Sequence, residues 1–575
     1  MKQRVDLVAF LVLALAAPAA APGRGVLAAP AATSATSARG ADSAPATVLA
    51  RGVVAAPESV ASEVGAAVLR EGGNAVDAAV AVHFALAVTF PRAGNLGGGG
   101  FMLVHTDSGD FAIDYRETAP AAATGDLYLD ASGEVVKGLS LDTHRAAGVP
   151  GSVAGMWLAH SRFGSLPWPQ LLAPAVRIAE RGWRVDARTA ATFALEKRNN
   201  FRDYFRGIAG ESLVQKELAA TLRRIAAEGP DGFYRGETAR LIVAEMARGG
   251  GLVTLEDLAG YRPVVRVPVA GSYRGLRMVS MPPPSSGGVA LIQLLNLLER
   301  YEPARPGHDS AAHVHLVAEL EKRVFADRAE YLGDPDFVPV PVESLISKSY
   351  AATRAAGISP EHRTSPAEIR CGAVTPESEQ TTHFSIVDRR GNAVANTTTL
   401  NDSYGSGIVV RGAGFLLNNQ MDDFSAKPGA PNLYGVTGGE ANAIAPGKRM
   451  LSSMCPAFVY RGDSLWLVLG TPGGPTIFTT VFQVIVNRVD FRMSLADAVA
   501  APRFHHQWPP RAMDADPIDF ERGHEPDAAT QGALEALGYV LRLREPIGDV
   551  QAIEIAGGRA TGASDPRGIG HVTAE

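Results

Sequence analysis

Thr381 stands at the start of a predicted β-strand, where its hydroxyl could act as a nucleophile. The β-branched and aromatic run Thr382–Val387 follows it, and the turn-forming cluster 388–392 leads to a second strand over Ala393–Leu400. A threonine hydroxyl is a weak nucleophile that needs a base, and an N-terminal threonine can use its own α-amine. The pKa of such an amine is about 7.7–8.0, close to working pH. This chemistry requires cleavage between Gln380 and Thr381.

The predicted hairpin places a second threonine opposite the first. If the turn is centred on Arg390, Thr381 faces Thr399, and both side chains project to the same face of the hairpin. The preceding segment 364–380 is polar, contains two prolines and is predicted to be a loop that could move away after cleavage. Taken alone, a threonine at the start of a strand is more often structural than catalytic, so the argument depends on the motifs that accompany it.

Four motifs occur in order along the chain. They are Glu379–His383 (EQTTH), Leu416–Phe424 (LLNNQMDDF), Leu451–Met454 (LSSM) and Pro472–Gly474 (PGG). Together they closely resemble the γ-glutamyltranspeptidase (glutathione hydrolase) family, from about Val48 to the C-terminus. The resemblance implies an α+β protein with the four-layer αββα sandwich of N-terminal-nucleophile hydrolases. It also implies one precursor that is cleaved into a large and a small subunit.

The same resemblance implies a set of catalytic residues. Thr381 is the implied nucleophile, its freed amine the base, and Thr399 the residue that holds either group in place. Gly473 and Gly474 follow a predicted strand and precede a predicted helix, and the family uses such a pair to bind the oxyanion of a tetrahedral intermediate. Each donor of this kind is typically worth about 2.7–4 kcal/mol. On its own, the glycine pair could equally form a simple left-handed turn.

The implied substrate-binding residues recognise the two charges of a γ-glutamyl group. Its carboxylate would be bound by Arg116, whose planar fork suits bidentate contact, and by two serine hydroxyls. Its ammonium would be held by Asp423. The remaining implied residues are the serines Ser452 and Ser453, then Asn401 and Gln420 beside Asp423, and Tyr434 in a lid loop over 428–439. Each of these side chains alone could be an ordinary polar group.

The N-terminus predicts export. Lys2 and Arg4 precede the apolar run Leu7–Ala17, and small residues follow it, so residues 1–28 have the pattern of a secretory signal peptide. The Ala/Pro/Ser/Thr-rich segment 29–47 is predicted to be a disordered linker. The large subunit would then span 48–380 and the small subunit 381–575. We expect a periplasmic or secreted protein with no membrane span after removal of the signal.

Composition and the remaining motifs narrow the function. The 575 residues are 46% hydrophobic and 20% charged with a net charge of −6, and no basic stretch suits nucleic acid. We predict no cofactor and no metal, because the pair His505–His506 lacks a third ligand. Cys371 and Cys455 are expected to be unpaired, although a single disulfide remains open. The glycines within Gly94–Phe101 do not fit a phosphate loop and are expected to permit close backbone approach.

Periodicity predicts a helix-rich middle, about 148–370, and mainly strands after 381. Helices are predicted over 59–70, 75–88, 171–181, 212–228, 238–248, 289–301, 310–331 and 476–487, and strands over 101–105, 111–115, 382–387, 393–400 and 465–470. Strand pairs flanked by helices suit a layered α+β protein.

The leading interpretation is an exported γ-glutamyltransferase and glutathione hydrolase. A γ-glutamyl group from glutathione or a similar compound would form an ester with Thr381 and then pass to water, an amino acid or a dipeptide. One alternative is a glutaryl or cephalosporin-type acylase of the same fold, against which Asp423 argues because such substrates carry no ammonium. Another is a non-catalytic secreted binding protein.

Self-cleavage before Thr381 is the first testable prediction. The natural chain should split into a large chain ending at Gln380 and a small chain beginning at Thr381. Because Thr381→Ala removes the nucleophile, this variant should remain one inactive chain. A denaturing gel with N-terminal sequencing measures both outcomes, and normal processing of Thr381→Ala would rule out the mechanism.

Overall fold

The computed structural model describes residues 48–372, 382–427, 430, 432–433, 439–510 and 515–575. The predicted signal peptide and linker lie outside these ranges, as do Gln380, Thr381, Tyr434 and most of the predicted lid loop. The expectations for those residues therefore stay predictions.

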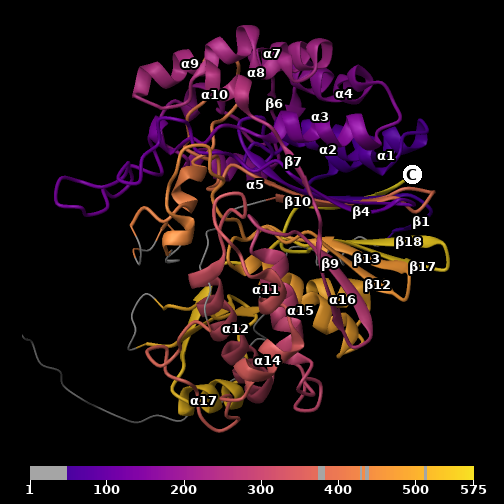
Figure 1. Cartoon of the computed structure of the whole chain (residues 1–575). Coiled ribbons are helices and arrows are strands. Elements are labelled where there is room, and N and C mark those ends of the chain that lie inside the picture. The colour runs from indigo at the N-terminus through magenta and orange to yellow at the C-terminus, as the bar shows by residue number, and fades with distance from the viewer. Residues whose placement is uncertain (1–47, 373–381, 428–429, 431, 434–438, 511–514) are drawn as a thin grey trace, which may run out of the picture. The chain divides into compact units, whose positions relative to one another are not determined.

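Two seven-stranded antiparallel sheets form the centre of the protein (Figure 1). One has the order β19 (His571–Ala574), β2 (Val53–Ala56), β10 (Thr382–Val387), β11 (Ala393–Thr399), β3 (Gly99–Thr106), β4 (Gly109–Asp114) and β7 (Val264–Arg266). The other has the order β1 (Val48–Ala50), β18 (Arg559–Ser564), β17 (Gln551–Ala556), β13 (Ser464–Gly470), β12 (Ala457–Arg461), β9 (Leu276–Ser280) and β8 (Val269–Tyr273). Each sheet combines strands from before residue 380 with strands from after it.

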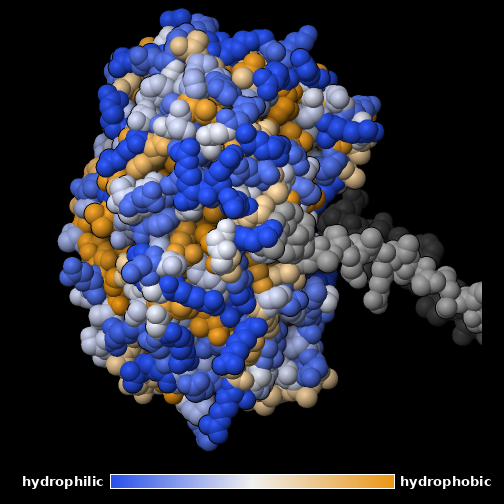
Figure 2. Space-filling model, turned by 90° about the vertical axis from the view of Figure 1, so that its right-hand side faces the viewer, coloured by the Kyte–Doolittle hydropathy of each residue, from blue (hydrophilic) through white to orange (hydrophobic). Residues whose placement is uncertain are grey.

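Helices cover the outer face of each sheet (Figure 1). The first layer contains α1 (Ser59–Arg70), α2 (Ala75–Thr89), α3 (Ser152–Phe163), α4 (Trp168–Arg181), α7 (Lys216–Glu228), α8 (Asp231–Tyr234), α9 (Gly236–Gly249) and α10 (Leu255–Gly260). The second contains α11 (Gly287–Leu298), α12 (Ala311–Tyr331), α14 (Lys348–Ala355), α15 (Thr476–Val489), α16 (Leu495–Ala500) and α17 (Ala528–Ala536). This arrangement confirms the predicted αββα sandwich. On the face shown in Figure 2, hydrophobic residues gather mainly at mid-height, the level of the sheets.

Shorter elements complete the described chain. They are β5 (Trp183–Arg184), β6 (Ser212–Leu213), α5 (Ala187–Leu195), α6 (Phe201–Tyr204), α13 (Val342–Leu345), a small sheet of β14 (Phe504–His505), β15 (Pro517–Glu521) and β16 (Val540–Arg544), and the 3₁₀ helices η1 (His144–Ala146), η2 (Gln420–Asp423) and η3 (Glu440–Asn442). None of the helices in the described ranges combines the length and apolar character needed to cross a bilayer.

The hairpin β10–β11 lies in the middle of its sheet. Thr382 pairs with Thr398 and Val387 with Ala393, which is the predicted register for every described pair. The side that carries Thr399 faces the other sheet, where Ser385 Oγ donates a hydrogen bond to Gln551 O on β17 at 3.0 Å. Alternate residues of the hairpin pack under α1 and α2 instead. The face that would carry the nucleophile is therefore the interior face between the sheets.

The glycine run allows close backbone contact beside the hairpin, as predicted. A Cβ atom on Gly98 would lie 2.0 Å from Thr399 O, and one on Gly100 would lie 2.3 Å from Thr397 O. Real Cβ atoms do not approach so closely, so only glycine lets β3 and the turn before it contact β11 in this way.

Most predicted elements are confirmed to within a few residues, and one helix start is wrong. The predicted helix 212–228 begins at Lys216, because Leu213 instead pairs with Trp183 between β6 and β5. Helix α2 starts directly after Asn74, which forms a reciprocal capping box with Asp77. Both cysteines are free, as expected.

Replacement of Gly98 should destabilise the protein. Gly98→Ala forces a methyl group against Thr399 O, and such overpacking typically costs about 1–3 kcal/mol, so the melting temperature should fall by several degrees. Gly260→Ala is the matched control, because nothing lies within 4 Å of the added methyl group. Equal melting temperatures for the two variants in a thermal unfolding experiment would contradict the close approach.

Candidate active site

Thr399 is held rigidly at the end of β11. Its Oγ1 accepts a hydrogen bond from Asn401 N at 2.8 Å, and its carbonyl accepts one from Asn95 Nδ2 at 2.9 Å. Asn401 has a φ of 79°, a conformation that asparagine tolerates better than most residues, and its Nδ2 donates to Asn419 O at 3.0 Å. Thr399 and Asn401 are therefore brought together with the segment that leads into η2. Asn95 was not singled out from the sequence.

Arg116 lies just beyond β4 and connects two further segments. Its side chain is buried, and its Nη2 donates to Asp423 Oδ2 on η2 and to Leu451 O at 2.9 Å. Its Nε donates to Met450 O at 3.1 Å. The family resemblance implies that Arg116 binds the carboxylate of a γ-glutamyl group and that Asp423 binds its ammonium. In the structure, these two side chains form a buried ion pair with each other.

Three polar atoms of this cluster lack hydrogen-bond partners within the described part of the chain. They are Arg116 Nη1, Asp423 Oδ1 and Gln420 Oε1, all inaccessible to solvent. Gln420 Nε2 does donate to Asp423 Oδ2 at 2.6 Å, so the side chains themselves are well positioned. Because buried polar groups are nearly always satisfied, and an unsatisfied one costs about 1–3 kcal/mol, this set indicates a ligand. One cationic donor and two acceptors suit a molecule with both a carboxylate and an ammonium.

The two serines lie on the segment that also holds Arg116. Ser453 Oγ accepts a hydrogen bond from Arg328 Nη2 at 2.9 Å, and Arg328 Nε donates to Ser286 Oγ at 2.9 Å. Because arginine only donates, it leaves the hydroxyl hydrogen of Ser453 available for an anion. Ser452 is fixed through its backbone, since its carbonyl accepts from Ser286 N at 2.6 Å. Arg328, buried on α12, is a supporting residue that sequence reasoning missed.

Glu117 is a buried acid next to Arg116 that was not assigned a role from the sequence. It is fully buried, and neither carboxyl oxygen has a hydrogen-bond partner among the described residues. Burial raises the pKa of Glu117 to about 8, although Arg116, with Nη1 at 3.7 Å, acts in the opposite direction. Because Glu117 is then mostly protonated at pH 7, it does not neutralise the charge that Arg116 offers to an anion.

Gly473 and Gly474 connect β13 to α15 with φ angles of 136° and 62°, which L-residues with side chains rarely adopt. Neither N–H group donates a hydrogen bond to any acceptor in the described ranges. Gly473 lines the same cavity as Thr382, the residue after the predicted nucleophile. Gly473 therefore lies near the start of β10.

Both histidines of the pair are buried and make hydrogen bonds within the protein. His506 Nε2 contacts Asp516 Oδ1 at 2.6 Å, and His505 Nδ1 contacts Thr479 Oγ1 at 3.1 Å, both in the interior. Among the described residues, no group of three or more His, Cys, Asp or Glu side chains could hold a metal ion.

The sandwich, with a Thr-rich central hairpin beside a charged pocket, defines an α+β hydrolase of the N-terminal-nucleophile class. The sequence model of the gamma-glutamyltranspeptidase family matches residues 61–575, and the chain belongs to this family. Members are made as precursors that are cleaved into two subunits. The fold and family predicted from the sequence are confirmed.

Individual relatives support this conclusion. The glutathione hydrolase proenzyme of Pseudomonas aeruginosa is 51% identical over 518 residues, which cover 88% of this chain and 92% of the relative. That of Escherichia coli (strain K12) is 49% identical over 528 residues, 89% of this chain and 90% of the relative. Among solved structures, a cephalosporin acylase from Bacillus halodurans superposes with a TM-score of 0.81 at 28% identity, covering 92% of this chain and 97% of that chain.

The raised pKa of Glu117 predicts a pH-dependent stability. Between its ordinary pKa of 4.5 and its folded pKa of about 8, the folded state holds a proton that the unfolded state has lost. This contribution to stability is complete below pH 4.5 and is lost as pH rises through 8. Glu117→Gln removes the effect, so the melting temperature of the variant minus that of the natural protein should increase from pH 5 to pH 8.5.

Glu256→Gln, at an exposed position of α10, is the matched control. Its melting temperature minus that of the natural protein should not increase from pH 5 to pH 8.5. Thermal unfolding at several pH values measures both differences. Parallel curves for the Glu117 and Glu256 variants would show that Glu117 is ionised in the folded protein.

Proposed function

We propose that the chain is an exported, self-cleaving enzyme that removes the γ-glutamyl group from glutathione and related compounds, by hydrolysis or by transfer. The observation that carries the substrate assignment is that two buried atoms, Arg116 Nη1 and Asp423 Oδ1, have no hydrogen-bond partner in the described part of the chain. A γ-glutamyl group carries an α-carboxylate, which would accept from Arg116 Nη1, and an α-ammonium, which would donate to Asp423 Oδ1. Ser452 and Ser453 would donate to the same carboxylate, and Asn401 and Gln420 would complete the ammonium site.

The proposed reaction begins with maturation. The hydroxyl of Thr381 attacks the carbonyl of Gln380, and water opens the resulting ester, which frees the α-amine of Thr381. That amine then takes the hydroxyl proton while Thr381 attacks the γ-carbonyl of the substrate. The N–H groups of Gly473 and Gly474 would stabilise the oxyanion, and Thr399 would orient the nucleophile.

The second half of the reaction releases the γ-glutamyl group. Water, an amino acid or a dipeptide attacks the γ-glutamyl ester and regenerates Thr381. We propose that Tyr434 and the loop 428–439 cover the bound group and limit the access of water. Export to the periplasm or the medium is proposed from the signal-like residues 1–28, with 48–380 as the large subunit and 381–575 as the small subunit.

An acylase of the same fold is the competing function. A glutaryl group lacks the α-ammonium, so its binding would leave Asp423 Oδ1 buried and unpaired, at a cost of about 1–3 kcal/mol. An acylase proenzyme of Pseudomonas sp. (strain SE83) is 40% identical to this chain, which is less than the 49% and 51% of the two glutathione hydrolase proenzymes. Both considerations favour γ-glutamyl substrates.

The direct test uses the purified natural protein. A denaturing gel with N-terminal sequencing should give a small chain that begins at Thr381, and the same protein should release a chromogenic amine from a γ-glutamyl anilide. A single uncleaved chain without amine release would favour a non-catalytic binding protein.

Asp423→Asn should change substrate preference. Truncating one partner of a buried, hydrogen-bonded charge pair typically costs about 2–5 kcal/mol, which is roughly thirty- to several-thousand-fold in kcat/KM. We therefore expect this variant to lose most γ-glutamyl activity and to gain relative activity on a glutaryl amide, while still cleaving itself. kcat/KM for both substrates measures the change.

Asp422→Asn is the matched control at the neighbouring carboxylate. Asp422 is already bound by Ser140 Oγ at 2.6 Å and by Leu433 N at 3.2 Å, so it has no direct part in binding the ammonium. The ratio of the two substrates should stay near the natural value in this variant. If the ratio of kcat/KM for the γ-glutamyl substrate to kcat/KM for the glutaryl substrate changes by less than about tenfold in Asp423→Asn, the change is below the low end of the expected range. That result would show that Asp423 is not the ammonium partner.

A further inference from the structure

A second polar cavity adjoins the proposed oxyanion site. It has a volume of about 500 Å³ and extends from Thr382 and Gly473 to the start of α5. A neighbouring lobe shares several of its walls and continues toward Tyr404 and Ile569. The ion pair of Arg116 and Asp423 does not line either lobe, so this space is separate from the γ-glutamyl pocket.

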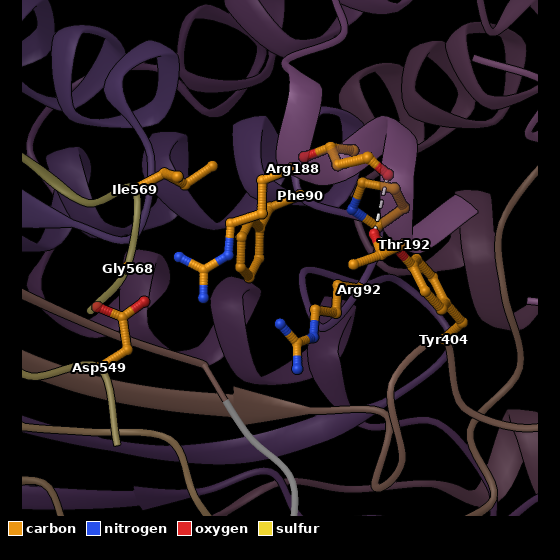
Figure 3. A pocket seen from close by; sticks show the side chains of 10 residues that line it. Phe90, Arg92, Arg188, Thr192, Tyr404, Asp549, Gly568 and Ile569 are labelled. Atoms are coloured by element: carbon orange, nitrogen blue, oxygen red, sulfur yellow. Dashed lines mark hydrogen bonds between the residues drawn. The ribbon is translucent and has the colours of Figure 1, made fainter. Parts of the chain in front are cut away.

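Opposite charges face each other across this cavity without pairing. Figure 3 shows the guanidinium groups of Arg92 and Arg188 and the carboxylate of Asp549 directed into the same space. Arg188 Nη1 donates to Arg567 O at 2.6 Å, and Arg92 Nε donates to Ser403 Oγ at 3.1 Å. In the described ranges, neither Arg92 nor Arg188 forms an ion pair with a carboxylate, although Asp549 and Glu545 both line the cavity.

Asp549 is anchored to the segment that carries Gly473. Its backbone N–H donates to Thr471 Oγ1 at 2.8 Å, and its Oδ1 accepts from Gln551 Nε2 at 3.0 Å. The preceding residue, Gly548, lies 3.7 Å from the position that a Cβ atom on Gly473 would take. Burial, and to a smaller extent Asp565, raise the pKa of Asp549 to about 7. A cation bound at this carboxylate would therefore stabilise its charged form.

The neighbouring lobe offers an apolar surface next to the charges. Phe90, Tyr404 and Ile569 line it, and the Tyr404 hydroxyl is hydrogen-bonded to Thr192 Oγ1 at 2.5 Å (Figure 3). This lobe is lined by two guanidinium groups, one carboxylate and an apolar wall. Such a lining matches a small zwitterion with a side chain, such as an amino acid or a short peptide.

We propose that this cavity binds the acceptor of the transfer reaction, a free amino acid or dipeptide, with its carboxylate at Arg92 and Arg188 and its ammonium at Asp549. The proposal rests on the γ-glutamyl transfer proposed above. Asp549 would take one proton from the ammonium, and the free amine would attack the carbonyl of the γ-glutamyl ester. A C–N bond forms as the ester C–O bond breaks, and the second amine proton passes to the threonine oxygen.

The test compares two acceptors that differ only at the carboxylate, glycylglycine and glycylglycine amide. With the natural enzyme, KM for the amide should be the higher of the two. In the double variant Arg92→Gln/Arg188→Gln, KM should rise for glycylglycine and change much less for the γ-glutamyl donor measured without acceptor. The fold-increase for glycylglycine should be at least about five times the fold-increase for the donor, as expected for the loss of two partly exposed ion pairs. In this double variant, the ratio of KM for glycylglycine amide to KM for glycylglycine should fall below two.

Arg181→Gln is the matched control, because Arg181 is exposed at the end of α4 and does not line the cavity. This variant should keep the natural preference. Asp549→Asn should raise KM for both acceptors together, because both carry the ammonium. An unchanged preference for the carboxylate in the double arginine variant would overturn the proposal.

Calorimetric titration of glycylglycine into each protein separates this proposal from the function on which it rests. In one outcome, the natural protein binds glycylglycine but releases no γ-glutamyl group, and the double arginine variant does not bind glycylglycine. That outcome would refute the proposed function and the acceptor role, but it would retain the cavity as a dipeptide site. Normal hydrolysis with glycylglycine binding equal in all variants would refute only the cavity assignment.

Discussion

The buried ion pair between Arg116 and Asp423 is the interaction on which the rest of the pocket depends. Removing both charges from water is costly, and the cost is offset only where the geometry is good and further hydrogen bonds are made. Here the carbonyl groups of Met450 and Leu451 and the amide of Gln420 supply those bonds. In the described chain the pair leaves one donor and one acceptor without a hydrogen-bond partner, and the proposed ligand, which carries both charges, would supply them.

The interleaved sheets place this pair beside the hairpin. Gly99 pairs with Thr399, and a Cβ atom on Gly99 would lie 2.5 Å from the Glu117 carboxyl group, so the end of β11 directly adjoins the Arg116 segment. Both sheets combine strands from before residue 380 with strands from after it. Cleavage before Thr381 would therefore leave two chains that share one core and cannot separate without exposing it to water.

The charge states of the acids set what each cavity can bind. Protonated Glu117 leaves the γ-glutamyl pocket able to attract a carboxylate, whereas Asp549 faces two arginines that lack carboxylate partners of their own in the described chain. In both places the proposed ligand is an amino acid, whose two charges would complete groups that have no partner in the described chain. The same principle therefore underlies the proposed donor site and the proposed acceptor site.

The sequence by itself determined the family, the hairpin register and the close backbone approach at the glycine run, because these depend on local patterns and on ordered motifs. It also identified Arg116 and Asp423 but not their mutual contact, which joins residues 307 positions apart. Only the tertiary structure decided that burial raises the pKa of Glu117, that Arg328 supports Ser453, and that Arg92, Arg188 and Asp549 share one cavity. Burial and long-range proximity determine such properties, and neither is written in the spacing of residues along a chain. The misplaced start of α7 has the same cause, since pairing with a distant strand overrode local helical periodicity.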